Sequence, residues 1–201
     1  SRTVNDTIKM AKEDLTIRTA LLEARLVWGD QSIYEETRTR FWRDVARGTE
    51  RDFLNQKLAE RTERHKRMGD SRYVVEPNVK EGKGGLRDLQ TLYWIVKHMH
   101  PDDTESLEDV MKTKIFTQHE YYLFMRAAKF LWTVRCHLHY ITGRPEERLS
   151  FDLQPEIAAR MGYQDRGEQL GVERFMKRYF LAAKDVGGLT RILAAKLEAQ
   201  Q

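Results

Sequence analysis

The sequence contains a single cysteine among its 201 residues, so no disulfide can form within the chain. A lone thiol is typical of a protein in a reducing compartment, and we therefore expect a cytoplasmic protein. Cys136 lies in the aromatic and apolar segment FLWTVRCHLHY, which predicts a buried and unreactive side chain. The neighbouring His137 and His139 supply too few ligands to predict a metal site, and we interpret them as structural.

Long hydrophobic runs and the motifs of catalytic sites are also missing. No apolar run reaches the length of a membrane span, and residues 1–6 do not combine a basic region with an apolar stretch, so we expect neither a membrane protein nor a signal peptide. There is no Asp-x-Asp after a Gly-Ser turn, no His-Asp pair and no Ser/His/Asp signature. We therefore predict no catalytic residue and no metal ligand within these 201 residues.

The numbers of basic and acidic residues are also nearly equal. The sequence has 35 basic and 31 acidic residues, with a net charge of +4. Segments such as LAERTERHKRMGD mix both signs, as solvated helix faces do. A nucleic-acid-binding module is therefore a weak alternative, and we expect no nucleic-acid partner.

Proline is scarce, and the long stretches between the four prolines have the apolar spacing of helices. The pattern predicts an all-α, up-and-down helical bundle that forms one domain over residues 1–201. The predicted helices cover residues 3–28, 30–46, 49–68, 86–100, 107–112, 117–143, a short helix with Pro155 near its start, and 172–196. The helix over 117–143 is the most apolar, which predicts a central position.

Several residues predict where these helices begin and end. Thr3 and Thr117 are expected N-caps, with Asp6 and Glu120 three residues later. Gly29 and Gly143 are expected stops, Pro101 and Asp102 are expected to end the helix over 86–100, and Gly187–Gly188 is a possible interruption of the last helix. In the helix over 86–100, one face carries Leu89, Leu92, Tyr93 and Val96.

The most informative motif is a glycine-rich segment, EPNVKEGKGGLRD, over residues 76–88. A glycine-rich stretch that leads into a helix places backbone N–H groups and the positive end of the helix dipole together, which suits a phosphate. Lys80, Lys83 and Arg87 would add positive charge to the backbone of Gly84–Gly85. A tight turn that needs glycine for steric reasons explains the segment equally well.

Three further charged residues and pairs are open to interpretation. Asp88 could orient Arg87 or Lys80, or it could cap the helix. Arg25, in the segment EAR before Gly29–Asp30, is a weaker candidate for substrate binding, because Glu23 and Arg25 do not face each other on a helix. The pair Glu13–Asp14 is interpreted as part of a solvated face.

The segment VEPNVKEGKGGLRDLQTLYWIVKH resembles the signature of the bacterial PII uridylyltransferase/uridylyl-removing family. Two further segments are similar to the family's flanking regions, namely RTVNDTIKMAKEDLTIRTALLEARLVWGD and LSFDLQPEIAARMGYQD. Glutamine synthetase adenylyltransferase has a related pattern and is the competing family. The opening EPNVKE and the tetrapeptide FDLQ favour the PII-modifying family.

The resemblance implies a nucleotidyltransferase domain, this helical region, an HD hydrolase domain and two ACT domains in one chain. Such an enzyme transfers UMP from UTP, with Mg²⁺, to a tyrosine of the PII signal protein and removes it again, and glutamine favours removal. The residues that bind metal would precede residue 1 and follow residue 201, so we expect the 201 residues alone to be inactive.

Two roles for this region follow from the resemblance. As a wall of the nucleotide and protein-substrate cleft, it would use Lys80, Lys83, Gly84, Gly85 and Arg87, with Asp88 in support and Arg25 as a second choice. As a non-catalytic scaffold that relays the glutamine signal, it would use the glycine-rich turn only as a structural joint.

Overall fold

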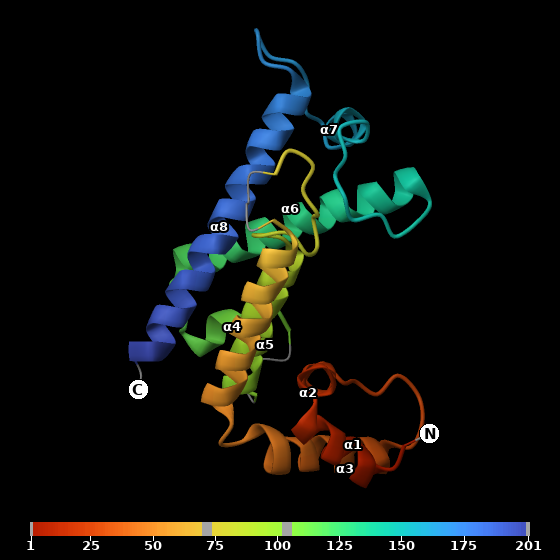
Figure 1. The fold of residues 1–201 in the computed structure, drawn as a ribbon, viewed down its shortest axis with the longest axis vertical. Helices are drawn as coiled ribbons and strands as arrows, with labels where there is room; N and C mark the ends of the chain where they lie inside the picture. Colours follow the sequence, from red (N-terminus) through yellow and green to blue (C-terminus); the bar gives the residue numbers. More distant parts are fainter. Residues whose placement is uncertain (1, 70–73, 102–105, 200–201) are drawn as a thin grey trace.

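The computed structural model describes residues 2–69, 74–101 and 106–199, and the regular elements that these residues form are helices (Figure 1). Strand-like pairing in the described residues is limited to two isolated bridges, Asn78 with Arg148 and Arg166 with Gln169. The elements are α1 (Val4–Glu13), α2 (Leu15–Leu22), α3 (Gln31–Phe41), the π-helix η1 (Trp42–Ala46), α4 (Glu50–Arg67), α5 (Leu86–Met99), the 3-10 helix η2 (Glu108–Thr113), α6 (Gln118–Thr142), α7 (Gln154–Arg160) and α8 (Gly171–Ala199). The predicted all-α class is confirmed.

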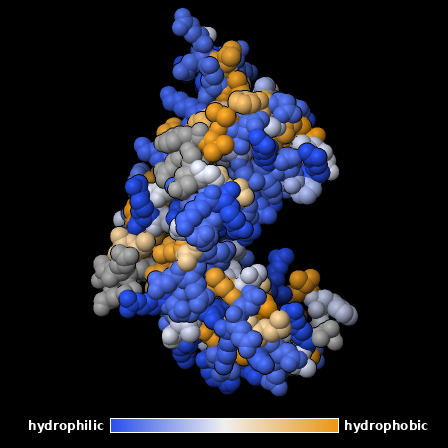
Figure 2. Space-filling model, in the orientation of Figure 1, coloured by the Kyte–Doolittle hydropathy of each residue, from blue (hydrophilic) through white to orange (hydrophobic). Residues whose placement is uncertain are grey.

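The helices form a long body with a smaller lobe at one end (Figure 1). In the body, α4 and α5 lie side by side, and α8 packs against α5, α6 and α7. Helices α1, α2 and α3 form the lobe, which α2 joins to α5. Figure 2 shows a notch between this lobe and the opposite end of the body, with a mainly hydrophilic surface around it. Within the described residues, no helix is long and apolar enough to cross a membrane.

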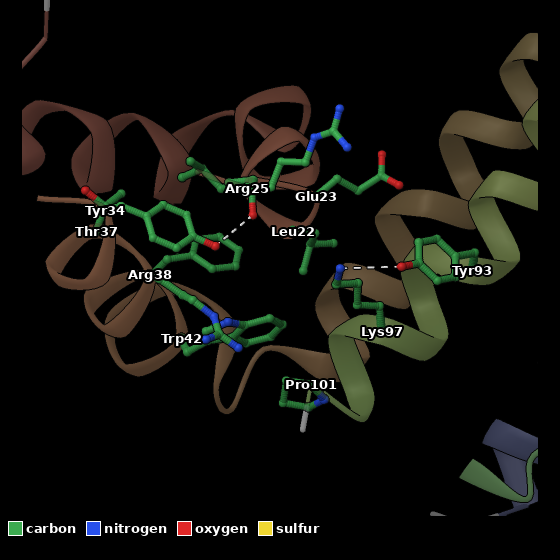
Figure 3. A pocket seen from close by; sticks show the side chains of 13 residues that line it. Leu22, Glu23, Arg25, Tyr34, Thr37, Arg38, Trp42, Tyr93, Lys97 and Pro101 are labelled. Atoms are coloured by element: carbon green, nitrogen blue, oxygen red, sulfur yellow. Dashed lines mark hydrogen bonds between the residues drawn. The ribbon is translucent and has the colours of Figure 1, made fainter. Parts of the chain in front are cut away.

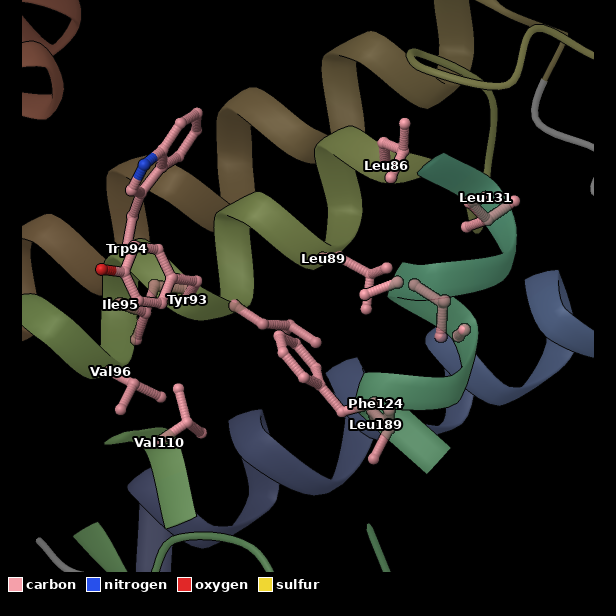
Figure 4. Packing of buried hydrophobic residues seen from close by; sticks show 14 of the residues in the cluster. Leu86, Leu89, Tyr93, Trp94, Ile95, Val96, Val110, Phe124, Leu131 and Leu189 are labelled. Carbon is pink, nitrogen blue, oxygen red and sulfur yellow. The ribbon is translucent and has the colours of Figure 1, made fainter. Parts of the chain in front are cut away.

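Helix α5 lies at the centre of the core. Ten of its residues are buried, including the predicted face of Leu89, Leu92, Tyr93 and Val96. Figure 4 shows Leu89 of α5 directed towards α6, and Val96 beside Val110 of η2. The central position predicted for residues 117–143 is therefore wrong, because α6 buries mainly one face and exposes side chains such as Tyr122 and Tyr140.

The single helix predicted over residues 3–28 is two helices that are separated at Asp14. The backbone of Asp14 is extended, and its carboxylate accepts the N–H groups of Thr16 and Ile17 at 2.6 and 3.1 Å, so it caps α2. Asp14 is thus a helix-breaking cap rather than part of a solvated helical face. The buried Arg18 donates to the carbonyl oxygens of Ala11 and Lys12 and closes the end of α1. Helix α2 then ends at Leu22, before the predicted stop at Gly29.

The other expected helix ends are mostly confirmed. Thr3 and Thr117 form capping boxes with Asp6 and Glu120, and Gly143 adopts the left-handed conformation that ends α6. Helix α8 continues through Gly187–Gly188 without a break. The expected stop at Asp102 lies outside the described residues.

Cys136 is exposed, which contradicts the prediction that its side chain is buried. In sequence it lies between Val134 and Leu138, which are buried, but its own side chain is on the outer face of α6. The apolar composition of the segment could not show which side chains face inward, because aromatic residues such as Trp132 and Tyr140 also lie on the outer face.

Gly84 has no room for a side chain where the turn before α5 meets α8. Its φ of +82° is in the left-handed region, and a Cβ there would lie 2.4 Å from the carbonyl oxygen of Ala183. Gly82 and Gly85 are similarly confined by the backbone of Asn78 and Val79. Close backbone packing therefore requires glycine at these positions.

We expect Gly84→Ala to lower the free energy of unfolding by about 3 kcal/mol, because it combines backbone strain with a clash against α8. Gly188→Ala is the matched control, since a Cβ at this helical position meets nothing within 4 Å. It should be neutral or stabilise the helix by about 0.5 kcal/mol. Urea denaturation measures both values, and equal stability of the two variants would contradict the steric argument.

A second prediction concerns His98, which is 3% exposed and stacks on Phe53 with 4.2 Å between ring centroids. Burial lowers the pKa of His98 to about 4. Between pH 6.5 and 4 the unfolded chain therefore binds a proton that the folded chain excludes. The free energy of unfolding should fall by roughly 3 kcal/mol across this window and should not depend on His98 above it.

The comparison variant is His98→Phe, which keeps an aromatic ring against Phe53 and cannot titrate. Denaturant titrations at several pH values should show a shallower dependence for this variant between pH 6.5 and 4. Parallel curves for the two proteins would show that His98 is not buried in its neutral form.

Candidate functional site

The glycine-rich turn, residues 74–85, is held in place by the segment that follows α6. Val79 N–H donates to the carbonyl oxygen of Glu147 at 2.8 Å, and Leu149 N–H donates to that of Pro77 at 2.9 Å. Within the turn, the side-chain oxygen of Asn78 accepts the N–H groups of Lys80 and Glu81 at 3.1 and 2.7 Å. These bonds fix the approach to α5, so the turn is ordered by contacts far apart in the sequence.

The backbone N–H groups at the start of α5 are all directed at acceptors within the protein. Gly84 N–H donates to the carboxylate of Asp88 at 2.8 Å, and Gly85 N–H donates to the carbonyl oxygen of Gly82 at 2.9 Å. Leu86 and Arg87 donate to the carbonyl oxygens of Val79 and Lys80. These bonds and the close packing favour the steric explanation of Gly84 and Gly85, and a phosphate site at their backbone stays a prediction.

Asp88 is the centre of a buried ionic cluster between α4 and α5. Its carboxylate is fully buried and is paired with Arg64 and Arg61, with Arg61 Nε at 3.3 Å. The Nε2 atom of His65 lies 2.9 Å from both carboxylate oxygens, so this nitrogen carries the proton that is shared with them. Asp88 thus binds α4 and the turn, and it does not orient Lys80 or Arg87 as the sequence suggested.

The partners of Asp88 decide its protonation state. Burial by itself would raise the pKa of the Asp88 carboxyl, but the hydrogen bond from His65 and the charges of Arg61 and His65 outweigh it. The pKa therefore lies below the ordinary carboxyl value of 3.8, and Asp88 is ionised at neutral pH.

Next to this cluster, α2, α4 and α5 enclose a hollow of about 350 Å³, which we call the basic hollow. Its charged lining comprises Lys57, Arg64, Arg67 and Arg87 together with Glu23, Glu60 and Glu81. The indole of Trp94 lies between two of the cations, with Lys57 Nζ 4.6 Å and the Arg87 guanidinium carbon 5.5 Å from its ring centroid. Such an arrangement presents cations beside an aromatic ring.

Lys57 and Arg87 are held in different ways. Burial lowers the pKa of the Lys57 ammonium group, although its ion pair with Glu60, at 2.6 Å, opposes this effect. Arg87 is partly exposed and contacts Glu81 at 3.3 Å and Gln90 at 3.0 Å. Arg87 is therefore the more accessible of the two cations, whereas the Lys57 side chain is buried in the wall.

The structure separates the residues that the sequence grouped into one site. Arg87 lines the basic hollow, and Lys80 is close to it through an ion pair of 3.9 Å with Glu81. Lys83 lines a different hollow, of about 320 Å³, with Arg67 and Arg148. Arg25 lies in a third hollow between α3 and α5 (Figure 3). Lys80 and Arg87 are therefore neighbours at one candidate site, and Lys83 lines an adjoining hollow that shares Arg67 with it.

Helix α4 contributes residues to this site that were not predicted from the sequence. Residues 57, 61, 64 and 65 follow the spacing i, i+4, i+7 and i+8, which places Lys57, Arg61, Arg64 and His65 on one helix face. This spacing could have predicted the cluster, because a row of basic residues on one helix face indicates an acidic partner on a neighbouring element. Within the part of the chain that the structure describes, no group of three or more His, Cys, Asp or Glu side chains is placed to hold a metal ion.

We expect Asp88→Asn to lower the free energy of unfolding at neutral pH by about 3–5 kcal/mol, because the buried guanidinium group of Arg64 and the partly buried one of Arg61 lose their counter-charge. In the unmodified protein, the contribution of Asp88 is present above pH 3.8 and is lost as the pH falls through its lower folded pKa. Denaturation curves between pH 2 and 7 should show this loss, and it should be absent in the variant. A change below 1 kcal/mol at pH 7 would refute the role of Asp88.

The chain was compared with protein families and with known proteins, and both comparisons found clear matches. Residues 52–194 match the family model described as GlnD PII-uridylyltransferase. Over the whole chain, the sequence is 61% identical to the bifunctional uridylyltransferase/uridylyl-removing enzyme of Phenylobacterium zucineum, covering 21% of that protein. The corresponding enzymes of Erythrobacter litoralis and Rhodospirillum rubrum are 58% and 56% identical, also over the whole chain, which covers 22% and 21% of their lengths.

The chain thus spans about a fifth of the length of these relatives. The comparison with solved structures finds no match. The family match includes α4, the glycine-rich turn and α5, which are the elements that build the Asp88 cluster and the basic hollow. The chain belongs to the GlnD PII-uridylyltransferase family, as the glycine-rich motif predicted.

Proposed function

We propose that this chain is the helical region of a longer cytoplasmic enzyme that transfers the uridylyl group of UTP to the PII signal protein and removes it by hydrolysis. The observation that carries the proposal is the similarity of the entire chain to proteins named bifunctional uridylyltransferase/uridylyl-removing enzymes, at 56–61% identity in three relatives. The family match favours this enzyme over glutamine synthetase adenylyltransferase.

Within that enzyme, the basic hollow forms part of the cleft for the nucleotide or the protein substrate. Arg87 and Lys80 are partly exposed, and Arg87 lies over the ring of Trp94. Side chains of this kind neutralise and orient phosphate groups, and such positioning accounts for much of the rate of nucleotidyl transfer. Mg²⁺ and the residues that hold it belong, in this proposal, to the part of the enzyme outside these 201 residues.

A second candidate function is a scaffold that relays the effect of glutamine between the two activities. It is supported by the turn, in which the glycines are required by packing and the N–H groups are satisfied internally. The scaffold role needs the Asp88 cluster to be intact and does not need the charge of Lys80 or Arg87.

We expect Lys80→Ala and Arg87→Ala, introduced into the full-length enzyme, each to lower kcat/KM for UTP in PII uridylylation by about ten-fold, because each removes a charge-assisted contact. Arg160→Ala on α7 is the control, since Arg160 is exposed and pairs only with its helix neighbour Glu156 among the contacts described. Its kinetics should be unchanged.

Steady-state kinetics at varied UTP and PII concentrations separate the two candidate functions. If neither Lys80→Ala nor Arg87→Ala changes UTP kinetics or PII modification while Gly84→Ala abolishes both activities, the cleft role is wrong and the scaffold role holds. Retention of glutamine control in the two charge variants would be consistent with a local role in substrate binding.

A further inference from the structure

The guanidinium group of Arg87 in the basic hollow is held along its edges by two neighbours. Its Nε and Nη2 atoms donate to one carboxylate oxygen of Glu81 at 3.4 and 3.3 Å, and its Nη1 atom donates to the side-chain oxygen of Gln90 at 3.0 Å. A guanidinium group has five N–H donors. These contacts engage three of them, so one N–H on each terminal nitrogen is left over in the described part of the chain. Two such donors suit two oxygens of one anion.

The same guanidinium group lies over an aromatic ring. Its central carbon is 5.5 Å from the ring centroid of Trp94, and Trp94 is 6% exposed. In Figure 4 the indole extends to the opposite side of α5 from Leu89, and it lines the basic hollow. The two edge contacts and the ring together limit the directions in which the Arg87 guanidinium group can turn.

Packing alone does not account for a tryptophan at position 94. The indole Nε1 of Trp94 is buried and has no hydrogen-bond partner among the described residues. A buried donor without an acceptor costs free energy, which an aliphatic or phenyl side chain avoids. Tryptophan also has the ring face that attracts cations most strongly, and Lys57 Nζ lies 4.6 Å from the same ring centroid. The arrangement therefore favours a role of this ring in holding cations.

We propose that Trp94 is a positioning residue, which holds Arg87 so that its two remaining N–H donors meet the anionic group of the substrate. The inference rests on the proposed function, because that function assigns a substrate contact to Arg87. Lys57 is not the cation that the ring presents to the substrate, since its side chain is buried and pairs with Glu60 at 2.6 Å. Trp94 thus acts through Arg87 and does not itself contact the substrate.

The test is a double-mutant cycle in the full-length enzyme, with steady-state kinetics of PII uridylylation at varied UTP concentration. We expect Trp94→Leu to lower kcat/KM for UTP by about three- to ten-fold, and Trp94→Phe, which keeps an aromatic face, to lower it by less than about three-fold. In an Arg87→Ala background, Trp94→Leu should have no further effect, because the group that the ring holds is gone. A ring that only stabilises the fold would lower kcat/KM by the same factor in both backgrounds.

Ile95→Val is the matched control, because Ile95 is the next residue on α5, is fully buried and does not line the basic hollow. This variant loses packing, as the Trp94 variants do, and its kinetics should be unchanged. A second measurement does not depend on how well Trp94→Leu folds. A ring-fluorinated tryptophan at position 94 keeps the shape of the indole and withdraws electron density from its face, so each added fluorine should lower kcat/KM for UTP further.

The outcomes separate the positioning role from the proposed function. Equal effects of Trp94→Leu in the presence and absence of the Arg87 side chain, or kinetics that fluorination leaves unchanged, would overturn the positioning role and leave the substrate contact of Arg87 intact. Normal kinetics of Arg87→Ala itself would instead refute the proposed cleft role, and the positioning role with it.

Discussion

The buried carboxylate of Asp88 is the interaction on which this structure depends. It joins Arg61, Arg64 and His65 of α4 to the first turn of α5 and to the N–H group of Gly84. A carboxylate in this position would be strongly destabilising without its cationic partners, and the partners would be equally unstable without it. Asp88 therefore fixes both the packing of α4 against α5 and the path of the glycine-rich turn.

This ionic cluster explains part of the glycine-rich motif in structural terms. Asp88 and the carbonyl groups of the turn accept the N–H groups of residues 84–87, so these backbone donors serve the fold. The glycines are needed because α8 and the turn's own backbone approach too closely for a Cβ atom. Among the side chains near the turn, Arg87 lies beside the ring of Trp94.

Helix α5 organises the whole molecule, since it forms the core and also carries a different charged surface at each end. Its first turn adjoins the basic hollow, and Tyr93 and Lys97 nearer its end line the hollow between α3 and α5. The helix is buried along most of its length, so the two surfaces are held at a fixed separation by the core.

The sequence alone determined the helical class, the family, both capping boxes, the stop at Gly143 and the buried face of α5, because these depend on neighbours within a few residues or on a distinctive motif. The tertiary structure decided the break at Asp14, the exposure of Cys136 and the partners of Asp88. These features depend on residues far apart in the chain, such as Arg64 with Asp88. Local spacing could reveal a row of cations on α4, but only folding could show which carboxylate they enclose.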